Sequence, residues 1–378
     1  MNNKLRFTAV IMAAMLAALT ICACDAAREN PGSSGESPTP TETPVTEPEA
    51  ETVQTESGEP STGSEEDYTE GLGDTFSGDT NEPEETGDSR DVDLIFFMGQ
   101  SNMSGAAGDT SAAPGVSEDA GMEFRAVSDP TRLYPITEPF GINENDPSGL
   151  HEFPGAKKGS LVSAFVNEYH ELTGRKVIAV SISMGATDMR TWMSPGAMAD
   201  VKNRFDRSLS YLKDNGYNVG HIYALWLHGE SDAIEGTDPE VYRTDLDEIM
   251  RPLFVGGLQK VFMIMPGRTI DYKDIFLKII DEQKQICAES SYYAVGTTLL
   301  TGVSTEYMRD QYHYDQHVLN LVGIESAKSV AYYTKTGIEK IVYDYRNSEY
   351  IIPDGVDPDS QEKEEPLDLH SINIDENY

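Results

Sequence analysis

The strongest constraint on the fold is an alternation between short apolar, β-branched runs and longer amphipathic stretches, which begins at Asp91. Runs that fit buried strands lie at residues 92–98, 176–182, 221–227, 261–265 and 292–299. Stretches with helical spacing lie between and after them, at about residues 161–172, 198–215, 240–254, 272–290 and 318–336. Strands alternating with helices predict an α/β fold, a three-layer α/β/α sandwich around a mainly parallel sheet.

In such a fold, functional side chains gather at the carboxyl ends of the strands. The first polar motif there, Gly99 to Gly105, follows the first predicted strand and carries Ser101 in a tight, glycine-flanked turn. It differs from the Gly-x-Ser-x-Gly elbow because Met103 stands where the second glycine would be. Taken alone, a serine in such a turn is more often structural than catalytic.

The second motif, Asp310 to His313, precedes the last predicted helix. A serine hydroxyl needs a base, and the base needs an acceptor that fixes its tautomer, so Asp310 and His313 on one loop fit these two roles. The alternative makes His313 a surface residue. Asp315 is better explained as the N-cap of the following helix, with His317 in its first turn.

Two further motifs follow other predicted strands, at residues 183–192 and 226–233. Gly185 in the first allows a backbone N–H to approach a reacting carbonyl closely, and polar side chains in the second can donate to an oxyanion. Each motif can also be only a loop. Four of them at one sheet edge favour a catalytic site.

Together the four motifs resemble the sialate O-acetylesterase and acetylxylan esterase branch of the SGNH hydrolases, over roughly residues 91 to 337. The resemblance implies an SGNH or flavodoxin-like fold and a carbohydrate O-acetylesterase. It implies Ser101 as the nucleophile, His313 as the base and Asp310 as its orienting partner. The implied oxyanion hole consists of the N–H groups of Ser101 and Gly185, helped by a side chain of the 226–233 motif.

That last side chain departs from the family pattern, which has Gln before Gly-Glu-Ser-Asp where this chain has His228. Imidazole can also donate a hydrogen bond, so we expect His228 to be the third oxyanion donor. Further residues are expected to support the site or the substrate: Gln100, Asn102, Glu230 and Trp192. Ring faces for sugar stacking are expected from Trp192, Tyr312 and Tyr314, although these rings can equally serve packing.

The first 24 residues are typical of a lipoprotein signal peptide. Lys4 and Arg6 precede an apolar run at 7–21 that is short for a membrane span, and Cys24 follows in a lipobox-like sequence. Lipidation of Cys24 would anchor an exported protein at the surface of a bacterial membrane. Because Cys22 is atypical at its position, ordinary signal cleavage is the alternative.

Residues 25–90 contain about nineteen acidic and two basic residues, and account for much of the formal charge of −37. With almost no apolar residues they predict a disordered acidic linker, and residues 351–378 predict an acidic C-terminal tail. The esterase domain is therefore expected at residues 91–350. We find no basic cluster for nucleic acid and no paired His or Cys spacing for a metal, and expect no cofactor.

Two other functions remain open from the sequence. One is a catalytically weak glycan-binding lipoprotein on the same fold, which only the His228 substitution favours. The other is a lipase or thioesterase, which would require a larger apolar surface around the site. The oligomeric state and the sugar are not predicted, and residues 106–158, rich in Gly and Pro, are expected to form loops over the site.

Overall fold

The alternating strands and helices of the sequence form one central seven-stranded sheet, in a computed structural model that describes residues 90–361 and 363–369. All these residues belong to one compact unit. The strand order is β3-β2-β4-β1-β5-β6-β7, and every neighbouring pair is parallel except β2 with β3. The predicted α/β class with a mainly parallel sheet is confirmed.

The strand bounds follow the predicted apolar runs closely. They are β1 (Asp91–Gly99), β2 (Gly121–Phe124), β3 (Leu133–Pro135), β4 (Lys176–Ser183), β5 (Asn218–Leu227), β6 (Lys260–Ile264) and β7 (Tyr293–Thr297). β2 and β3 were not predicted and lie within the 106–158 segment, which was expected to form loops. They are only four and three residues long, so neither supplies a recognisable period.

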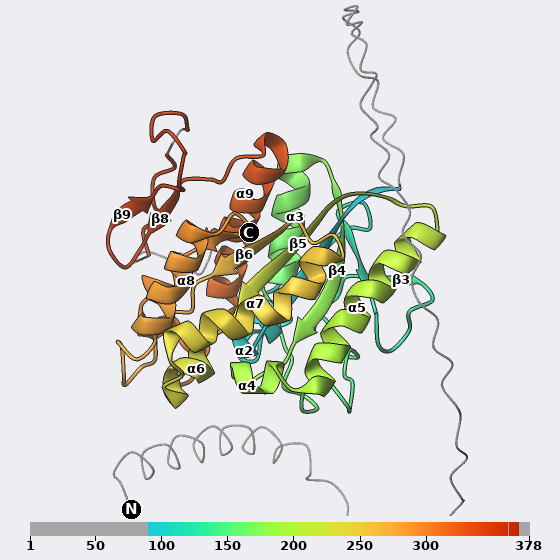
Figure 1. Cartoon of the computed structure of the whole chain (residues 1–378), viewed down its shortest axis with the longest axis horizontal. Coiled ribbons are helices and arrows are strands. Elements are labelled where there is room, and N and C mark those ends of the chain that lie inside the picture. The colour runs from blue at the N-terminus through green and yellow to red at the C-terminus, as the bar shows by residue number, and fades with distance from the viewer. Residues whose placement is uncertain (1–89, 362, 370–378) are drawn as a thin grey trace, which may run out of the picture. The chain divides into compact units, whose positions relative to one another are not determined.

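Helices cover both faces of the sheet and complete the three layers (Figure 1). One face carries α3 (Val162–Thr173) and α9 (Gln316–Thr336), which contact each other. The other carries α5 (Pro195–Asp214), α7 (Pro239–Val255) and α8 (Leu277–Glu289). Short helices α2 (Ser101–Ser104), α4 (Met189–Trp192) and α6 (Glu230–Glu235) lie together at one edge of the sheet (Figure 1).

Two buried clusters hold these layers together, because alternate residues of each strand point to opposite faces. Leu94, Phe96 and Met98 of β1 belong to the cluster that includes Phe205 of α5. Ile95 and Phe97 belong to the cluster under α3 and α9. β1 lies in the middle of the sheet and is buried from Val92 onward, so the turn that follows it begins at the end of a buried central strand.

Local signals fix the helix ends as the sequence predicted. α3 ends at Gly174, which has φ 66°, and the Asp315 side chain accepts a hydrogen bond from Val318 N at 3.1 Å as the N-cap of α9. His317 lies in the first turn of α9. Cys287 is a buried residue of α8.

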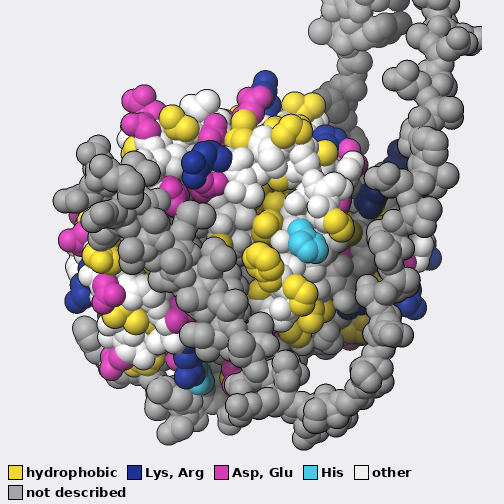
Figure 2. Space-filling view, turned by 90° about the horizontal axis from the view of Figure 1, so that it is seen from below, with side chains coloured by type: hydrophobic (Ala, Val, Ile, Leu, Met, Phe, Trp, Pro, Cys, Tyr) yellow, Lys and Arg dark blue, Asp and Glu magenta, His cyan; other side chains and the backbone are white. Residues whose placement is uncertain are grey.

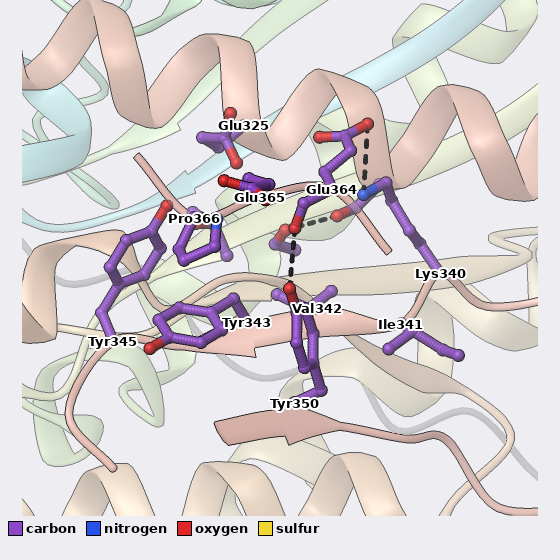
Figure 3. Close-up of a pocket in the computed structure, with 13 residues that line it drawn as sticks. Glu325, Lys340, Ile341, Val342, Tyr343, Tyr345, Tyr350, Glu364, Glu365 and Pro366 are labelled. Carbon is purple, nitrogen blue, oxygen red and sulfur yellow. Dashed lines mark hydrogen bonds and ion pairs between the residues drawn. The ribbon is translucent and has the colours of Figure 1, made fainter. Parts of the chain in front are cut away.

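After α9 the chain forms a hairpin of β8 (Val342–Asp344) and β9 (Glu349–Ile351), which borders a small hollow (Figure 3). The Tyr350 hydroxyl donates to the Glu364 carbonyl at 2.9 Å, and Lys340 pairs with the Glu364 carboxylate at 3.4 Å. The cavity of about 20 Å³ suits about one water molecule. It contains no residue of the four motifs, and the described part of the expected tail packs against the domain here.

The predicted signal peptide, the Cys24 lipidation site and the 25–90 linker lie almost wholly outside the described residues. Within residues 90–361 and 363–369, no helix combines the length and apolarity that a membrane span needs.

Candidate active site

Ser101 lies at the first position of α2, directly beyond the carboxyl end of β1, and is 9% exposed. The turn before it requires glycine: Gly99 has φ 144°, and a Cβ there would lie 2.0 Å from the Leu227 carbonyl oxygen. Gln100, which is buried, donates its backbone N–H to the same carbonyl at 3.0 Å. The ends of β1 and β5 therefore hold the Ser101 turn between them.

Asn102 joins the Ser101 turn to the distant His313 loop. Its Nδ2 donates to the Tyr312 carbonyl at 3.2 Å, and its Oδ1 accepts from Tyr314 N at 3.4 Å. Both partners are neighbours of His313, so the carboxamide clamps the backbone on each side of the imidazole. The Ser101 and His313 segments are thus brought together although 212 residues separate them in sequence.

Asp310 orients His313 as the sequence indicated. The two carboxylate oxygens lie 2.9 and 2.8 Å from His313 Nδ1, and Oδ1 also accepts the backbone N–H of His313 at 3.0 Å. Burial alone would raise the pKa of Asp310, but the hydrogen bonds and the charge of His313 lower it below its usual value. Because Asp310 holds Nδ1, Nε2 is the ring nitrogen that can accept a proton.

Among the described residues, no hydrogen bond joins the Ser101 Oγ to the His313 imidazole. Such bonds are often long in enzymes without substrate and tighten only in the complex. Ser101 and His313 therefore lie on segments that Asn102 joins, and the contact between Asp310 and His313 is already formed.

Gly185 follows β4 and lies directly beside Ser101. A Cβ built on Gly185 would be 3.4 Å from the Cβ of Ser101. Its N–H, however, donates to Glu152 Oε2 at 2.6 Å. Glu152 was not predicted from the sequence, because it lies in the segment without periodic signals and beside no motif.

His228 is fully buried between aromatic rings rather than open to the site. Its ring centroid lies 4.9 Å from that of Trp226 and 5.7 Å from that of Trp192. Neither ring nitrogen has a hydrogen-bond partner among the described residues, and burial lowers the pKa of His228 to about 3. A fully buried, neutral imidazole cannot reach a substrate oxygen as it lies here.

The 226–233 motif reaches the Ser101 turn through other groups. Glu230 Oε1 accepts from Asn102 Nδ2 at 3.0 Å, and Ser231 N donates to Gln100 Oε1 at 3.5 Å. Burial raises the pKa of Glu230. Gln100, Asn102 and Glu230 thus connect the Ser101 turn to the 226–233 motif.

The aromatic residues proposed for sugar stacking divide into two groups. Trp192 and Tyr314 are buried, and the Trp192 Nε1 donates to Thr187 Oγ1 at 3.0 Å, so these two rings pack the loops instead of facing substrate. Tyr312 is only partly buried. Larger exposed side chains stand on the loops that follow β3 and β6, including Phe153 (59% exposed) and Tyr272 (46%).

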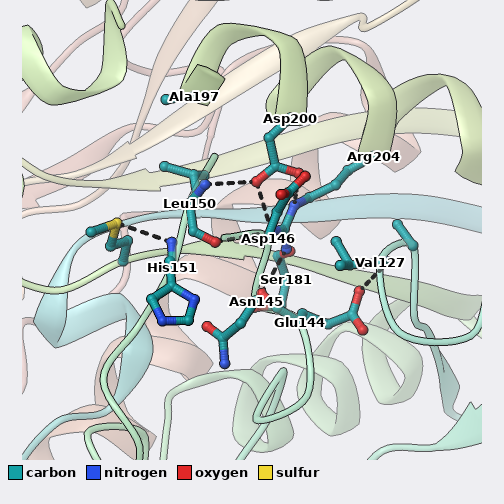
Figure 4. Close-up of polar contacts among 12 residues, drawn as sticks. Val127, Glu144, Asn145, Asp146, Leu150, His151, Ser181, Ala197, Asp200 and Arg204 are labelled. Carbon is teal, nitrogen blue, oxygen red and sulfur yellow. Dashed lines mark hydrogen bonds and ion pairs between the residues drawn. The ribbon is translucent and has the colours of Figure 1, made fainter. Parts of the chain in front are cut away.

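A buried polar network supports the loop that carries Glu152 (Figure 4). Arg204 of α5 pairs with Asp200 at 2.8 Å and donates to the carbonyls of Glu144 and Ser181 at 3.1 and 3.0 Å. Asp200 in turn accepts from Leu150 N at 2.9 Å. The base of the loop is therefore fixed to α5 and β4.

The edge that carries α2, α4 and α6 is the face seen from below in Figure 2. Hydrophobic side chains gather there around an exposed histidine (Figure 2). A hollow is lined by residues 107–110, Lys158 and Arg309, which are near the Ser101 and His313 segments in sequence. In the part of the chain that the structure describes, no group of three or more His, Cys, Asp or Glu side chains is arranged to hold a metal.

Residues 91–331 match the family model described as "Carbohydrate esterase, sialic acid-specific acetylesterase". The matched range contains all four motifs and the Ser101, Asp310 and His313 cluster. The chain belongs to this family. It is a carbohydrate esterase, and the resemblance read from the motifs is confirmed.

The carbohydrate esterase is also similar to solved structures. A protein of Arabidopsis thaliana is 17% identical, with 62% of this chain and 96% of that chain covered and a TM-score of 0.47. A carbohydrate acetylesterase from Xanthomonas citri is 16% identical, with 64% and 57% covered and a TM-score of 0.40. A mutant of an acetyl-xylooligosaccharide esterase from Geobacillus Stearmophilus is 12% identical, with 66% and 95% covered and a TM-score of 0.34. None of the curated proteins compared matches this chain.

Proposed function

We propose that this carbohydrate esterase is a serine hydrolase that removes O-acetyl groups from a sugar or polysaccharide through an acyl-enzyme. The observation that carries the proposal is the Asn102 clamp, which holds the Ser101 turn against the His313 loop while Asp310 holds His313 Nδ1 at 2.8 Å. A weak alcohol nucleophile requires a base within reach and an acceptor that orients that base. Asp310 supplies the acceptor, and the Asn102 clamp brings the Ser101 segment to the His313 loop.

In the proposed reaction, His313 Nε2 accepts the Ser101 proton as Oγ attacks the acetyl carbonyl carbon. The bond from that carbon to the sugar oxygen then breaks, and the sugar hydroxyl leaves with the proton that His313 returns. Water, deprotonated by His313, attacks the acetyl-enzyme, and the bond from the acetyl carbon to Ser101 Oγ breaks as Oγ takes the proton from His313. Acetic acid leaves and releases its remaining acidic proton to the solvent to give acetate. Asp310 stabilises the imidazolium that forms in each half.

The developing oxyanion would be bound by the backbone N–H groups of Ser101 and Gly185, which flank the nucleophile. Gly185 suits this role because it places no side chain beside Ser101, although Glu152 must first release its N–H. His228 is left out of the proposed hole because its ring is fully buried. The sequence-based hypothesis of a third donor at His228 remains testable by substitution.

We further propose that the enzyme is exported and held at a bacterial membrane surface by lipid on Cys24. The support is the sequence alone: a basic start, a short apolar run and a lipobox-like segment. Mass spectrometry of the N-terminus of the cell-bound protein would test this. An unmodified N-terminus beyond residue 24 would contradict it.

Hydrolysis assays on the full chain test the activity. Acetate release from 4-nitrophenyl acetate, acetylated xylan and O-acetyl sialic acid should be measured for the wild type and Ser101→Ala. We expect Ser101→Ala to lose at least about 10³-fold of kcat, and the ranking of substrates to identify the sugar. Activity retained by Ser101→Ala would exclude the acyl-enzyme, and absent wild-type activity with retained sugar binding would favour the glycan-binding alternative.

A further inference from the structure

The N–H of Gly185 already has a negatively charged partner. Glu152 Oε2 accepts from Gly185 N at 2.6 Å and from Ser104 Oγ at 3.2 Å. A Cβ built on Gly185 would lie 3.3 and 3.4 Å from the two Glu152 carboxylate oxygens and 3.4 Å from the Ser101 Cβ. The Glu152 carboxylate and the nucleophile therefore flank the same glycine, and Glu152 is only 5% exposed.

This contact is incompatible with the chemistry assigned to Gly185. The oxyanion of a tetrahedral intermediate would need the same N–H, and two negatively charged oxygens at contact distance repel each other strongly when partly buried. A carboxylate also has the shape and charge of acetate, the product of the proposed reaction. Glu152 thus lies where an acetyl group or acetate would have to bind.

Building on the proposed function, we propose that Glu152 occupies the oxyanion hole of the resting enzyme as an internal, acetate-like ligand. The ester carbonyl and free acetate then compete with Glu152 for the N–H of Gly185. The fraction of molecules with Glu152 withdrawn sets the apparent affinity for both, because binding to a partly populated state is weakened by that fraction.

The loop is built so that its tip can withdraw while its ends stay fixed. Leu150 is buried and donates its N–H to Asp200 at 2.9 Å. Lys157 is buried and donates Nζ to Ser181 and Ser183 Oγ at 3.1 and 2.9 Å. Between these anchors, residues 153–155 are exposed. The Glu152 backbone N–H also donates to Asn145 Oδ1 at 2.8 Å, so its carboxylate leaves Gly185 either by a turn of the side chain alone or by a shift of the short segment between the two anchors that breaks this bond.

The test compares Glu152→Ala and Glu152→Gln with the wild-type full chain. Three quantities are measured: the rate of hydrolysis of 4-nitrophenyl acetate, the rate of covalent labelling of Ser101 by a fluorophosphonate, and the strength of inhibition by sodium acetate at constant ionic strength. We expect Glu152→Ala to raise kcat/KM and the labelling rate about fivefold or more, and to strengthen acetate inhibition by a similar factor. Glu152→Gln should increase the three quantities less than Glu152→Ala does, because its amide oxygen can still accept a hydrogen bond from Gly185.

Two controls keep the outcome clear. Glu118→Ala removes an exposed carboxylate before β2 and should change none of the three measured quantities. Ser104→Ala removes only the second hydrogen-bond donor to Glu152. It should shift all three measured quantities in the same direction as Glu152→Ala, but to a smaller extent. If the Glu152 variants do not fold, Ser104→Ala tests the inference in their place.

Unchanged or lower rates in folded Glu152 variants, with acetate inhibition as in the wild type, would overturn the inference. In that case Ser101 would still be labelled and the proposed function would stand. Absence of both labelling and hydrolysis in every variant, including the wild type, would instead overturn the proposed function and the inference with it.

Discussion

Asn102 and Glu230 form a buried hydrogen bond of 3.0 Å between segments that are 128 residues apart. The same carboxamide holds the backbone on both sides of His313. One side chain thereby ties together the turn after β1, the start of α6 and the loop before α9. The proposed catalytic geometry depends on Asn102, although Asn102 is neither the proposed base nor the proposed nucleophile.

We expect Asn102→Ala to lower both stability and turnover. Glu230 Oε2 has no partner among the described residues, so the substitution would leave the whole buried carboxylate without a hydrogen bond. Leaving a buried polar group unsatisfied costs about 1–3 kcal/mol in the free energy of unfolding. Urea unfolding measures this loss, and kcat of the folded variant should fall because the His313 loop loses its clamp.

Glu230→Gln is the matched variant for Asn102→Ala. Its amide oxygen can still accept from Asn102, so we expect a smaller loss of stability than for Asn102→Ala. A double-mutant cycle with Glu230→Ala then isolates the coupling between the two residues. Strictly additive losses would show that the bond contributes little and that Asn102 acts only through the His313 loop.

Asp310→Asn should reduce kcat far more than it reduces stability. The carboxylate accepts from Nδ1 and from two backbone N–H groups, whereas an amide that faces Nδ1 can favour the wrong tautomer. Loss of the orienting carboxylate costs about 10⁴-fold in kcat in the best-studied serine triad. Steady-state kinetics with an acetyl ester measure the effect. A loss in kcat below about tenfold would show that catalysis does not require Asp310 to orient His313.

His228→Leu separates a packing role from an oxyanion role. Leucine has a similar volume and no donor, and it removes two buried nitrogens that have no partner among the described residues. Replacing an unsatisfied polar group by an apolar one is close to neutral for stability. We expect kcat within about threefold of the wild type, whereas loss of an oxyanion donor would cost about 10²–10³-fold.

The sequence allowed the sheet and most of the candidate site to be predicted because their signals are local. β1 is nearly continuous in apolar residues, and the glycine at its end and the Asp310–His313 spacing can be recognised without knowledge of distant contacts. Functional side chains of parallel sheets gather at the carboxyl ends of the strands, and this rule predicted that the motifs lie close together. The same reasoning gave Asn102 and Glu230 as supporting residues but not their mutual bond.

The missed features depend on long-range packing. Glu152 acquires its position through Asn145, Asp200 and Gly185, none of which marks it in the sequence. His228 resembles a donor by its place in a motif, yet two tryptophans, at positions 192 and 226, enclose its ring. Whether a polar side chain faces a site or a core is set by partners that only the folded chain brings together.

Asp232 gives the enzyme a pH-dependent contribution to stability near its site. Its carboxylate is buried and accepts from Met189 N at 3.1 Å and from Thr237 Oγ1 at 2.9 Å, and Oδ2 lies 3.6 Å from His228 Nδ1. Burial raises the pKa of Asp232 from 3.8 to about 7. His228 Nδ1 is too far away for a hydrogen bond to the protonated carboxyl, so the Asp232 carboxyl group is held by Met189 and Thr237.

The sign follows from proton binding in the two states. Between about pH 4 and pH 7 the folded protein holds a proton on Asp232 that the unfolded chain releases. The free energy of unfolding therefore falls as pH rises through this window, by at most about 1.4 kcal/mol per pH unit from this group. Asp232→Asn cannot ionise, so its stability relative to the wild type should increase from pH 5 to pH 7.5.

Urea unfolding at several pH values measures that difference. The comparison cancels the groups that titrate in both proteins, and Asp119→Asn, an exposed aspartate before β2, serves as the control that should show no such trend. A stability difference between Asp232→Asn and the wild type that does not change with pH would mean that Asp232 is ionised throughout. The 226–233 motif would then contain a buried carboxylate stabilised by Met189 and Thr237 alone.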